Sequence, residues 1–278
     1  KFVPLSGLSG VNVKKGPKDK AWGEESRGLA DWYDGPTLVE AIDAFQPSKG
    51  NTLDKPLRLI VSDVYSEGKG VTARGRVAQG VLCAGDRVCV LPIGDEAVVS
   101  RIEHGSATSA SASPYSYAAP AGGGTDNDAV VRSKFAASGD NVEVVLTGID
   151  IARTSPGCVL CHSDPDLRPP VKRKFRAKVL VMEKLGVPVI RGAQVLMHMH
   201  SIDVPAAVSR LVCTTKRDGS VKSDRPRVLT GGVSATVEIT SHERICIEEF
   251  GDCRALGRFA LRRGGETIAV GVVEKVLG

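Results

Sequence analysis

From residue 57 to its end, the chain consists of short runs of β-branched and other apolar residues that are interrupted by glycines. Gly75, Gly80 and Gly85 recur every five residues among the first of these runs. A tightly curved barrel needs glycine where its strands bend or turn. The pattern therefore predicts closed β-barrels rather than a helical domain. Gly85-Asp86 fits a hairpin that leads into a strand at residues 87–91.

Two predicted linkers divide the chain into three units. Its 278 residues suit about two domains of ~100–200 residues each. Residues 35–45 are the one clear helix, with Pro36 in its first turn and Leu38, Ile42 and Phe45 on one face. The polar, turn-rich residues 46–52 predict a first linker, and residues 165–170 a second. The expected units are residues 1–50, a β-barrel at 51–166 and a β-barrel at 167–278. Residues 105–126 have little to bury and predict a disordered insertion in the first barrel.

The second barrel begins with the clearest strand of the sequence. Its apolar residues alternate with cations, so that one face packs on a core and the other meets water or a partner. The apolar set is Phe175, Ala177, Val179 and Val181, and the cationic set is Lys172, Lys174, Arg176 and Lys178. Further strands are expected at 194–200, 207–214, 234–240 and 245–248, with a loop at 187–192 and a hairpin turn at 216–219.

The chain closes with a basic hairpin over residues 256–273. Apolar residues alternate along both arms, and Gly264-Gly265 suits the turn. Arg258, Arg262 and Arg263 form a cationic rim that fits phosphates or an acidic protein, although a solvated hairpin edge has the same composition.

Charge is uneven along the chain. Residues 1–164 carry 17 Lys and Arg against 20 Asp and Glu, a net charge of −3, whereas residues 165–278 carry 20 against 12, a net charge of +8. The basic half is therefore the better candidate for contact with RNA or an acidic surface.

No apolar run of about 18 residues is present to span a bilayer, and the start lacks a signal peptide, so we expect a soluble, cytoplasmic protein without membrane contact. Because it begins with Lys in mid-pattern, we expect a fragment of a longer chain.

Seven cysteines, an odd number in apolar surroundings, predict free thiols in a reducing compartment. Cys83, Cys89, Cys213 and Cys246 are expected to be small core residues. Residues 158–162 spell the C-x-x-C-H of haem attachment, but in a strand Cys158 and Cys161 point to opposite faces. His198 and His200 could share a strand face, yet no further ligand lies nearby in sequence, so we favour a structural role. No metal site is predicted.

Several segments together resemble the elongation factor 1 alpha-like family of ribosome-rescue GTPases, the partners of Pelota, over nearly the whole chain. Residues 2–10 are similar to the final nucleotide-binding element of a translational GTPase domain, and 32–38 to its last helix. Residues 54–59 are similar to the entry to the second domain, and 148–151 to its later strands. The combination of residues 59–65, 157–161 and 258–273 points to the rescue branch.

The resemblance implies a mainly β fold: two consecutive antiparallel barrels, domains 2 and 3 of a translational GTPase, preceded by the last strand and helix of its α/β G domain. It implies that the parent protein binds GTP and Mg and delivers Pelota to stalled ribosomes in no-go and non-stop mRNA surveillance. It places Ser6, Gly7 and Leu8 against the guanine base. Arg258, Arg262 and Arg263 would contact the partner or ribosomal RNA, with Lys172, Lys174 and Arg176 as the second choice. The expected partners are Pelota and the small ribosomal subunit, not DNA, and the expected state is a monomer.

The sequence departs from the family in one essential respect. It contains no G-x-x-x-x-G-K-[ST] phosphate loop and no D-x-x-G or N-K-x-D element. Phosphoryl transfer needs a phosphate cradle, a magnesium site and a positioned water, so we expect this chain by itself neither to bind nor to hydrolyse GTP. No other catalytic motif is found. Two alternatives stay open: a non-GTPase paralogue that bridges the exosome and the superkiller complex, and release factor three. A tRNA-carrying elongation factor is disfavoured by the 105–126 insertion.

Overall fold

The computed structural model describes residues 2–20, 22, 24, 27–45, 52–67, 70–104, 131–215 and 220–278. The predicted insertion at 105–126, the turn at 216–219 and nearly all of the first linker lie outside these residues. The chain divides into two compact units, Lys1–Asn51 and Thr52–Gly278. Both barrels belong to the second unit.

Among its described residues, the first unit contains two short α-helices, α1 (Arg27–Ala30) and α2 (Leu38–Asp43). The predicted helix at 35–45 is therefore present, but Pro36 precedes it instead of occupying its first turn. Thr37 caps the helix in a capping box: its hydroxyl accepts from the Glu40 N–H at 3.2 Å, and the Glu40 carboxylate accepts from the Thr37 N–H at 2.9 Å. This reciprocal pair fixes where the helix begins. Among the described residues, no helix is long and apolar enough to cross a membrane.

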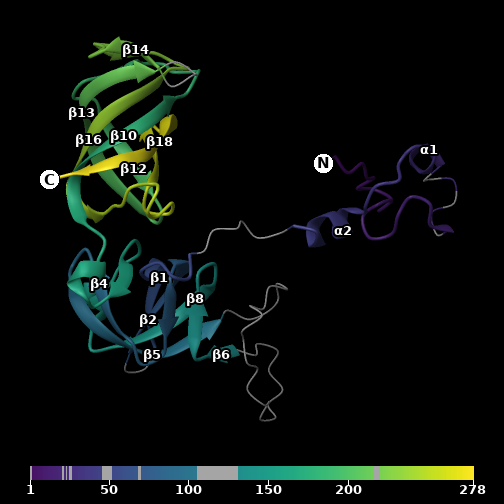
Figure 1. The fold of residues 1–278 in the computed structure, drawn as a ribbon, viewed down its shortest axis with the longest axis horizontal. Coiled ribbons are helices and arrows are strands. Elements are labelled where there is room, and N and C mark those ends of the chain that lie inside the picture. Colours follow the sequence, from purple (N-terminus) through teal and green to yellow (C-terminus); the bar gives the residue numbers. More distant parts are fainter. Residues whose placement is uncertain are drawn as a thin grey trace. The chain divides into compact units, whose positions relative to one another are not determined.

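Six strands close the first barrel in the order β4-β9-β1-β2-β8-β5, because β5 also pairs with β4 (Figure 1). β6 extends the sheet at β5, and β3 pairs with β7 as a separate ribbon. Two single-turn 3₁₀ helices, Ile151–Arg153 and Pro165–Leu167, flank the last strand. The strands are β1 (Arg58–Glu67), β2 (Gly70–Gln79), β3 (Val81–Cys83), β4 (Arg87–Leu91), β5 (Asp95–His104), β6 (Val131–Ser133), β7 (Phe135–Ala137), β8 (Asn141–Thr147) and β9 (Val159–His162).

The second barrel closes in the same way, in the order β12-β17-β18-β10-β16-β13, with β13 paired back to β12 and β14 attached to β13. β11 and β15 form a two-stranded ribbon beside it. The two closed barrels confirm the predicted fold class. The strands are β10 (Val171–Val181), β11 (Val189–Ile190), β12 (Gln194–Met199), β13 (Ile202–Thr215), β14 (Val221–Asp224), β15 (Val228–Leu229), β16 (Ser234–Cys246), β17 (Arg258–Arg263) and β18 (Glu266–Leu277).

Three local predictions were wrong because pairing over long distances decided them. Gly85-Asp86 makes a turn, but not a hairpin: β3 pairs with β7, whereas β4 pairs with β5 and β9. The strands expected at 234–240 and 245–248 are one strand, β16, whose register against β10 shifts at a bulge. The loop expected at 187–192 contains β11, a strand too short to leave a periodic signal.

Each barrel has its own core, and a third apolar cluster joins them. The alternating set Phe175, Ala177, Val179 and Val181 is buried in the second barrel, as predicted. The third cluster combines outward residues of the first barrel with residues from β16 and the segment after it. Its members are Ile60, Cys89, Leu91, Val159, Cys161, Cys246, Cys253 and Leu256.

The cysteines follow this division. All seven are free. Cys158 belongs to the first barrel's core and Cys161 to the joining cluster, which confirms that they point to opposite faces of the strand. Cys89 and Cys246 are buried as expected, but Cys83 is exposed and Cys213 is only half-buried.

Gly157 marks a second contact between the barrels. It has φ +90°, and a Cβ atom at this position would lie 1.8 Å from Cγ2 of Ile202, at the start of β13. An L-residue is strained at this φ, and here its side chain would also collide with the other barrel. Gly148 offers a matched comparison, because its φ is +85° and its added Cβ would meet nothing within 4 Å.

We expect Gly157→Ala to destabilise the protein more than Gly148→Ala does. Gly148→Ala carries only backbone strain, about 1 kcal/mol, whereas Gly157→Ala adds about 1–3 kcal/mol of overpacking. Urea unfolding of the two variants measures the difference. Adding Ile202→Ala should shrink the excess cost of Gly157→Ala, and an unchanged excess would contradict the contact.

Candidate partner-binding surface

The closing hairpin is present as β17 and β18, joined at Gly264-Gly265, both with positive φ. Phe259 and Leu261 point into the core, and the intervening Ala260 faces outward. Arg258 and Arg262 alternate with the inward residues and so share the outward side with Ala260. Each guanidinium donates to a nearby backbone carbonyl, that of Arg258 to Arg254 at 3.1 Å and that of Arg262 to Gly265.

Arg263 does not join the other two arginines. It lies at the end of β17, where alternation directs it away from the outward side, and its guanidinium donates to the carbonyl of Val187. This contact ties the segment before β11 to the hairpin. The structure therefore brings together two of the three predicted arginines.

Apolar side chains lie beside Arg258 and Arg262 on the same outward surface. Ala260 pairs with His198 of β12 on one side and with Val270 of β18 on the other, and Val270 pairs with Leu180 of β10. Leu180 is 49% exposed and Val270 is 41% exposed. Leu196, which is 38% exposed, stands opposite Arg262. We call this surface the hairpin face, made of Leu180, Leu196, Arg258, Ala260, Arg262 and Val270.

The hairpin face combines exposed apolar area with cations that are not neutralised. Among the described residues, no carboxylate forms an ion pair with Arg258 or Arg262. An apolar centre flanked by arginines is the composition of a protein-binding surface, whereas a purely cationic face fits phosphates.

The second predicted cationic set differs, because two of its members are paired. Lys174 Nζ lies 3.2 Å from one carboxylate oxygen of Glu238 on β16, and Arg176 Nη2 lies 3.1 Å from the other. Burial alone raises the pKa of Glu238, but hydrogen bonds from Arg176 and Lys174 outweigh it, so that the pKa lies below its ordinary value. Lys172 is exposed and forms no ion pair with a described carboxylate.

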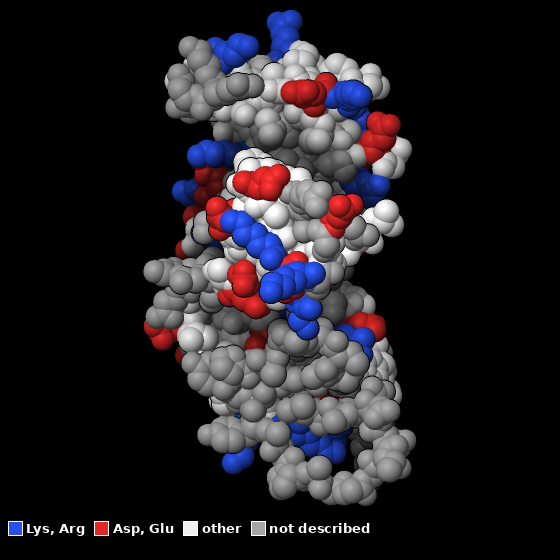
Figure 2. Space-filling model, turned by 90° about the vertical axis from the view of Figure 1, so that its right-hand side faces the viewer, with Lys and Arg blue, Asp and Glu red and all other residues white. Residues whose placement is uncertain are grey.

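Pairing of this kind explains why the net charge of a segment does not locate a binding surface. Figure 2 shows one face of the molecule, on which lysine and arginine side chains lie next to acidic ones. Exposed cations that have no carboxylate beside them are the better guide to a partner.

The predicted guanine-contacting element is a loop closed by its own hydrogen bonds. The Ser6 N–H donates to the Val11 carbonyl at 3.1 Å, and the Ser6 carbonyl accepts from the Gly10 N–H at 2.9 Å. Leu8 at its tip is fully exposed, and an added Cβ on Gly7 would meet nothing within 4 Å. The loop is closed by these two hydrogen bonds and presents its tip to solvent.

His198 and His200 do not share a strand face. His198 lies on β12 with its ring beside the carboxylate of Asp203, whereas His200 lies in the turn after β12 with φ +41°. Burial lowers the pKa of His200 to about 4, so it is neutral at physiological pH. Within the described part of the chain, no group of His, Cys, Asp and Glu could hold a metal ion.

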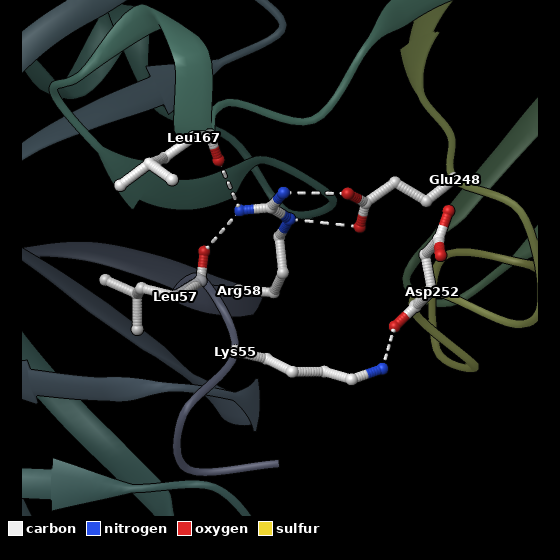
Figure 3. Close-up of polar contacts among 6 residues, drawn as sticks. All are labelled: Lys55, Leu57, Arg58, Leu167, Glu248 and Asp252. Atoms are coloured by element: carbon white, nitrogen blue, oxygen red, sulfur yellow. Dashed lines mark hydrogen bonds and ion pairs between the residues drawn. The ribbon is translucent and has the colours of Figure 1, made fainter.

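Among the described residues, the ion pair with the least exposed partners joins the two barrels, and sequence reasoning missed it. Arg58 of β1 donates from Nε and Nη2 to the two carboxylate oxygens of Glu248, at 3.0 and 2.7 Å (Figure 3). Its Nη1 donates to the carbonyls of Leu57 and Leu167, at 2.8 and 2.9 Å. The partners are 190 residues apart, so no local pattern could have paired them.

Lys55 adds an interbarrel contact at the edge of the same region. Its Nζ donates to the backbone carbonyl of Asp252 at 2.7 Å (Figure 3). The Arg58 and Glu248 side chains are only 4% and 10% exposed, and each finds a charged partner and good geometry. The barrels are therefore fixed to one another by a satisfied buried ion pair as well as by the joining cluster.

Comparison with known proteins gives a consistent relationship. Residues 174–274 match the family GTP-eEF1A C-terminal domain-like. The chain is 35% identical over 277 residues to Protein HBS1 of Drosophila melanogaster, which covers 99% of this chain and 36% of that protein. It is 31% identical over 279 residues to Elongation factor 1-alpha of Metallosphaera sedula, which covers 99% of this chain and 55% of that protein. The chain thus spans about half or less of the length of these relatives.

Solved structures agree on the fold. The crystal structure of sup35 complexed with GDP superposes with a TM-score of 0.69, over 100% of this chain and 59% of that chain, at 23% sequence identity. The complex of sup35 with GMPPNP also gives a TM-score of 0.69. At this level of identity the likeness establishes the fold and nothing about partners.

We expect Arg58→Ala to cost about 3–5 kcal/mol of unfolding free energy, because it leaves the Glu248 carboxylate buried without its partner. The double variant Arg58→Met/Glu248→Leu should cost much less, since both charges are removed together. Urea unfolding measures both. Arg153→Ala, which breaks an exposed ion pair with Asp95, is the control and should hardly move the midpoint. A loss for Arg58→Ala no larger than the control's would refute the role of the buried pair.

The Glu238 cluster predicts a dependence of stability on pH. Because the folded-state pKa of Glu238 lies below its unfolded value of about 4.3, its contribution is complete above that value and is lost as pH falls through the folded pKa. Glu238→Gln lacks this contribution. The difference in unfolding free energy between the parent and Glu238→Gln should therefore be constant from pH 7 to about pH 5 and shrink below it. Chemical unfolding from pH 7 to pH 3 measures the difference, and a difference that grows on acidification would be the wrong sign.

Proposed function

We propose that this chain is the docking module of a GTPase that delivers Pelota to stalled ribosomes. The proposal rests on its similarity, over 99% of its length, to the HBS1 and elongation factor 1-alpha translation factors. The chain carries the C-terminal domains of such a translational GTPase. In this proposal the two barrels recognise and position the partner, and the parent protein supplies GTP hydrolysis. The process served is ribosome rescue in no-go and non-stop mRNA surveillance.

One structural observation supports a docking role above the others. The hairpin face exposes Leu180, Leu196 and Val270 beside two arginines that have no carboxylate partner among the described residues. Burying such a surface against a protein removes apolar area from water and gives the arginines a chance to pair. Pelota is the proposed occupant because the residues that favour the rescue branch include the closing hairpin itself.

The barrels suit this role because they present the hairpin face on a closed, rigid scaffold. A surface built on paired strands keeps its shape, so that less conformational entropy is lost on binding. The Arg58–Glu248 pair and the joining cluster extend this rigidity to the first barrel. The first barrel is the proposed contact to the small ribosomal subunit.

The first unit is proposed as the end of the G domain, residues 1–50, followed by domain 2 at 51–166 and domain 3 at 167–278. Ser6, Gly7 and Leu8 are proposed to contact guanine when the rest of that domain is present, with GTP and Mg bound there. The closed loop at residues 6–11 and the exposed Leu8 fit a surface that another part of the parent protein covers.

We expect Arg258→Glu/Arg262→Glu to weaken Pelota binding about tenfold or more while leaving the fold intact, because each guanidinium contacts a carbonyl only three or four residues away and substitutions outside the core usually change stability by only about 0.5 kcal/mol. Calorimetric titration of Pelota into each variant measures the loss. Lys222→Glu/Arg227→Glu, a matched reversal of two exposed cations on the same barrel, is the control and should bind normally.

Arg263→Glu should behave differently from the face variants. Its guanidinium holds the Val187 carbonyl, so its loss should lower the unfolding midpoint as well as any affinity. If Arg258→Glu/Arg262→Glu binds Pelota as the parent does, the assignment of the hairpin face fails. If the chain binds release factor one instead of Pelota, the release factor three alternative takes its place.

A further inference from the structure

Two cysteines of the first barrel face each other on its outward side. Cys89 of β4 and Cys161 of β9 are directly opposite in the antiparallel ladder. Both belong to the joining cluster, whereas their strand neighbours Val88, Val90 and Leu160 belong to the first barrel's core. The Cys161 Sγ donates to the Cys89 carbonyl at 3.6 Å. We call Cys89 and Cys161 the thiol pair.

The backbone geometry of the thiol pair suits a disulfide. Directly opposite residues of an antiparallel ladder have Cα atoms about 4.5 or 5.5 Å apart. A disulfide joins residues whose Cα atoms are about 4.4–6.8 Å apart. A bond between the two sulfurs therefore needs rotation of the side chains but no separation of the strands.

While the barrels are docked, the thiol pair is closed to solvent and unreactive. Both residues are 0% exposed. They pack in the joining cluster with Cys246, at the end of β16, and with Cys253 and Leu256, in the segment before β17. Burial raises the pKa of both thiols, that of Cys161 to about 12, so both stay protonated. The thiolate is the nucleophile, so a protonated and covered pair does not react.

Two guanidiniums stand ready to activate the thiol pair once this cover is removed. Burial and the neighbouring thiol raise the pKa of Cys161, whereas the charges of Arg58 and Arg168 lower it. Arg58 lies on β1, and Arg168 donates to Glu96 of β5 at 3.3 Å, so both arginines stay with the first barrel. Separation of the barrels removes Glu248 from Arg58 and frees its charge. Solvent-exposed cysteines beside arginine form thiolates readily.

Each barrel can stay folded when the contact between them opens. The two barrel cores consist of different residues, and each barrel closes on its own strand pairing. Native proteins open locally at a lower free energy than they unfold globally, in units that follow such divisions. Rare separation of the barrels therefore exposes the thiol pair without unfolding β4 or β9.

We propose that the thiol pair is a masked redox site, a dithiol that a peroxide oxidises to a disulfide when the barrels separate and that the docked barrels protect. The Cys161 thiolate attacks one oxygen of hydrogen peroxide, the O–O bond breaks, hydroxide leaves, and Cys161 becomes a sulfenic acid. The Cys89 sulfur then attacks that of Cys161 and displaces its hydroxide, which takes up the Cys89 proton as water. In total, two thiols and one peroxide give one disulfide and two waters.

Treatment of the reduced full chain with hydrogen peroxide tests this proposal. Free thiols are then blocked with N-ethylmaleimide, and peptide mapping by mass spectrometry without reduction follows each cysteine over time. The expected product is a disulfide that links the peptides containing Cys89 and Cys161. It should form much more slowly than the exposed Cys83 is oxidised, because the thiol pair reacts only from the separated state.

Glu248→Ala removes the interbarrel partner of Arg58 and leaves both arginines and the thiol pair in place. It should accelerate formation of the disulfide about tenfold or more, because it leaves a charge buried between the barrels without its partner. The milder Glu248→Gln should act in the same direction. Leu229→Ala, in the core of the second barrel and outside the joining cluster, is the control. It costs a similar amount of stability, measured by urea unfolding, and should accelerate the disulfide much less.

Three results would overturn the proposal. Peroxide leaves the thiol pair reduced in the parent and in both Glu248 variants, the mapped disulfide joins a different pair such as Cys161 and Cys246, or Glu248→Ala and Leu229→Ala accelerate oxidation equally. The last result would mean that the thiols are reached only by global unfolding. Cys89→Ala separates the two chemical steps: its Cys161 should stop at the sulfenic acid, which dimedone labels.

Discussion

The Arg58–Glu248 pair is the contact on which the relation between the two barrels depends. Strand pairing and a separate apolar core close each barrel by itself. Only the contacts between the barrels fix how the surface of one barrel is oriented relative to the other. A bidentate pair that is almost fully buried requires strict geometry. Both charges lose their hydration, and they are stable only when they form hydrogen bonds to each other. The apolar joining cluster contributes buried apolar area, which depends little on orientation. The ion pair instead fixes the orientation of one barrel relative to the other. Gly157 against Ile202 adds a steric limit on approach.

The parts of the fold that the sequence predicts are those that local patterns decide. Alternation identifies β10 and both arms of the closing hairpin, and Gly264-Gly265 locates the closing turn. Which strands pair depends on residues far apart in the sequence, so local patterns wrongly predicted a hairpin at Gly85-Asp86. The strand β11 was missed because it is too short to leave a periodic signal. The choice of family came from resemblance, and the relatives agree with it, whereas the barrel topology confirms the fold class alone.

The candidate site shows the same limit more sharply. Sequence alternation places Lys172, Lys174 and Arg176 on one face, and it places the arginines of β17 on another. It cannot say which cations are neutralised, because Glu238 lies 62 residues from Arg176. Nor can alternation distinguish Arg263 from Arg258 and Arg262, because the partner of Arg263 is a backbone carbonyl 76 residues away. Only the folded barrel distinguishes a free cation from a paired one.

The distinction between free and paired cations also explains why a basic domain needs a buried acid. A row of arginines and lysines on adjacent strands would repel itself and lose its order, since like charges directly opposite each other destabilise a sheet. Glu238 forms ion pairs with Lys174 and Arg176 of β10, so that attraction replaces repulsion on this side of β16. Because these two cations hold the pKa of Glu238 below its ordinary value despite burial, the carboxylate is charged at neutral pH. The sheet can therefore keep Lys174 and Arg176 partly exposed while their attraction to Glu238 offsets their mutual repulsion.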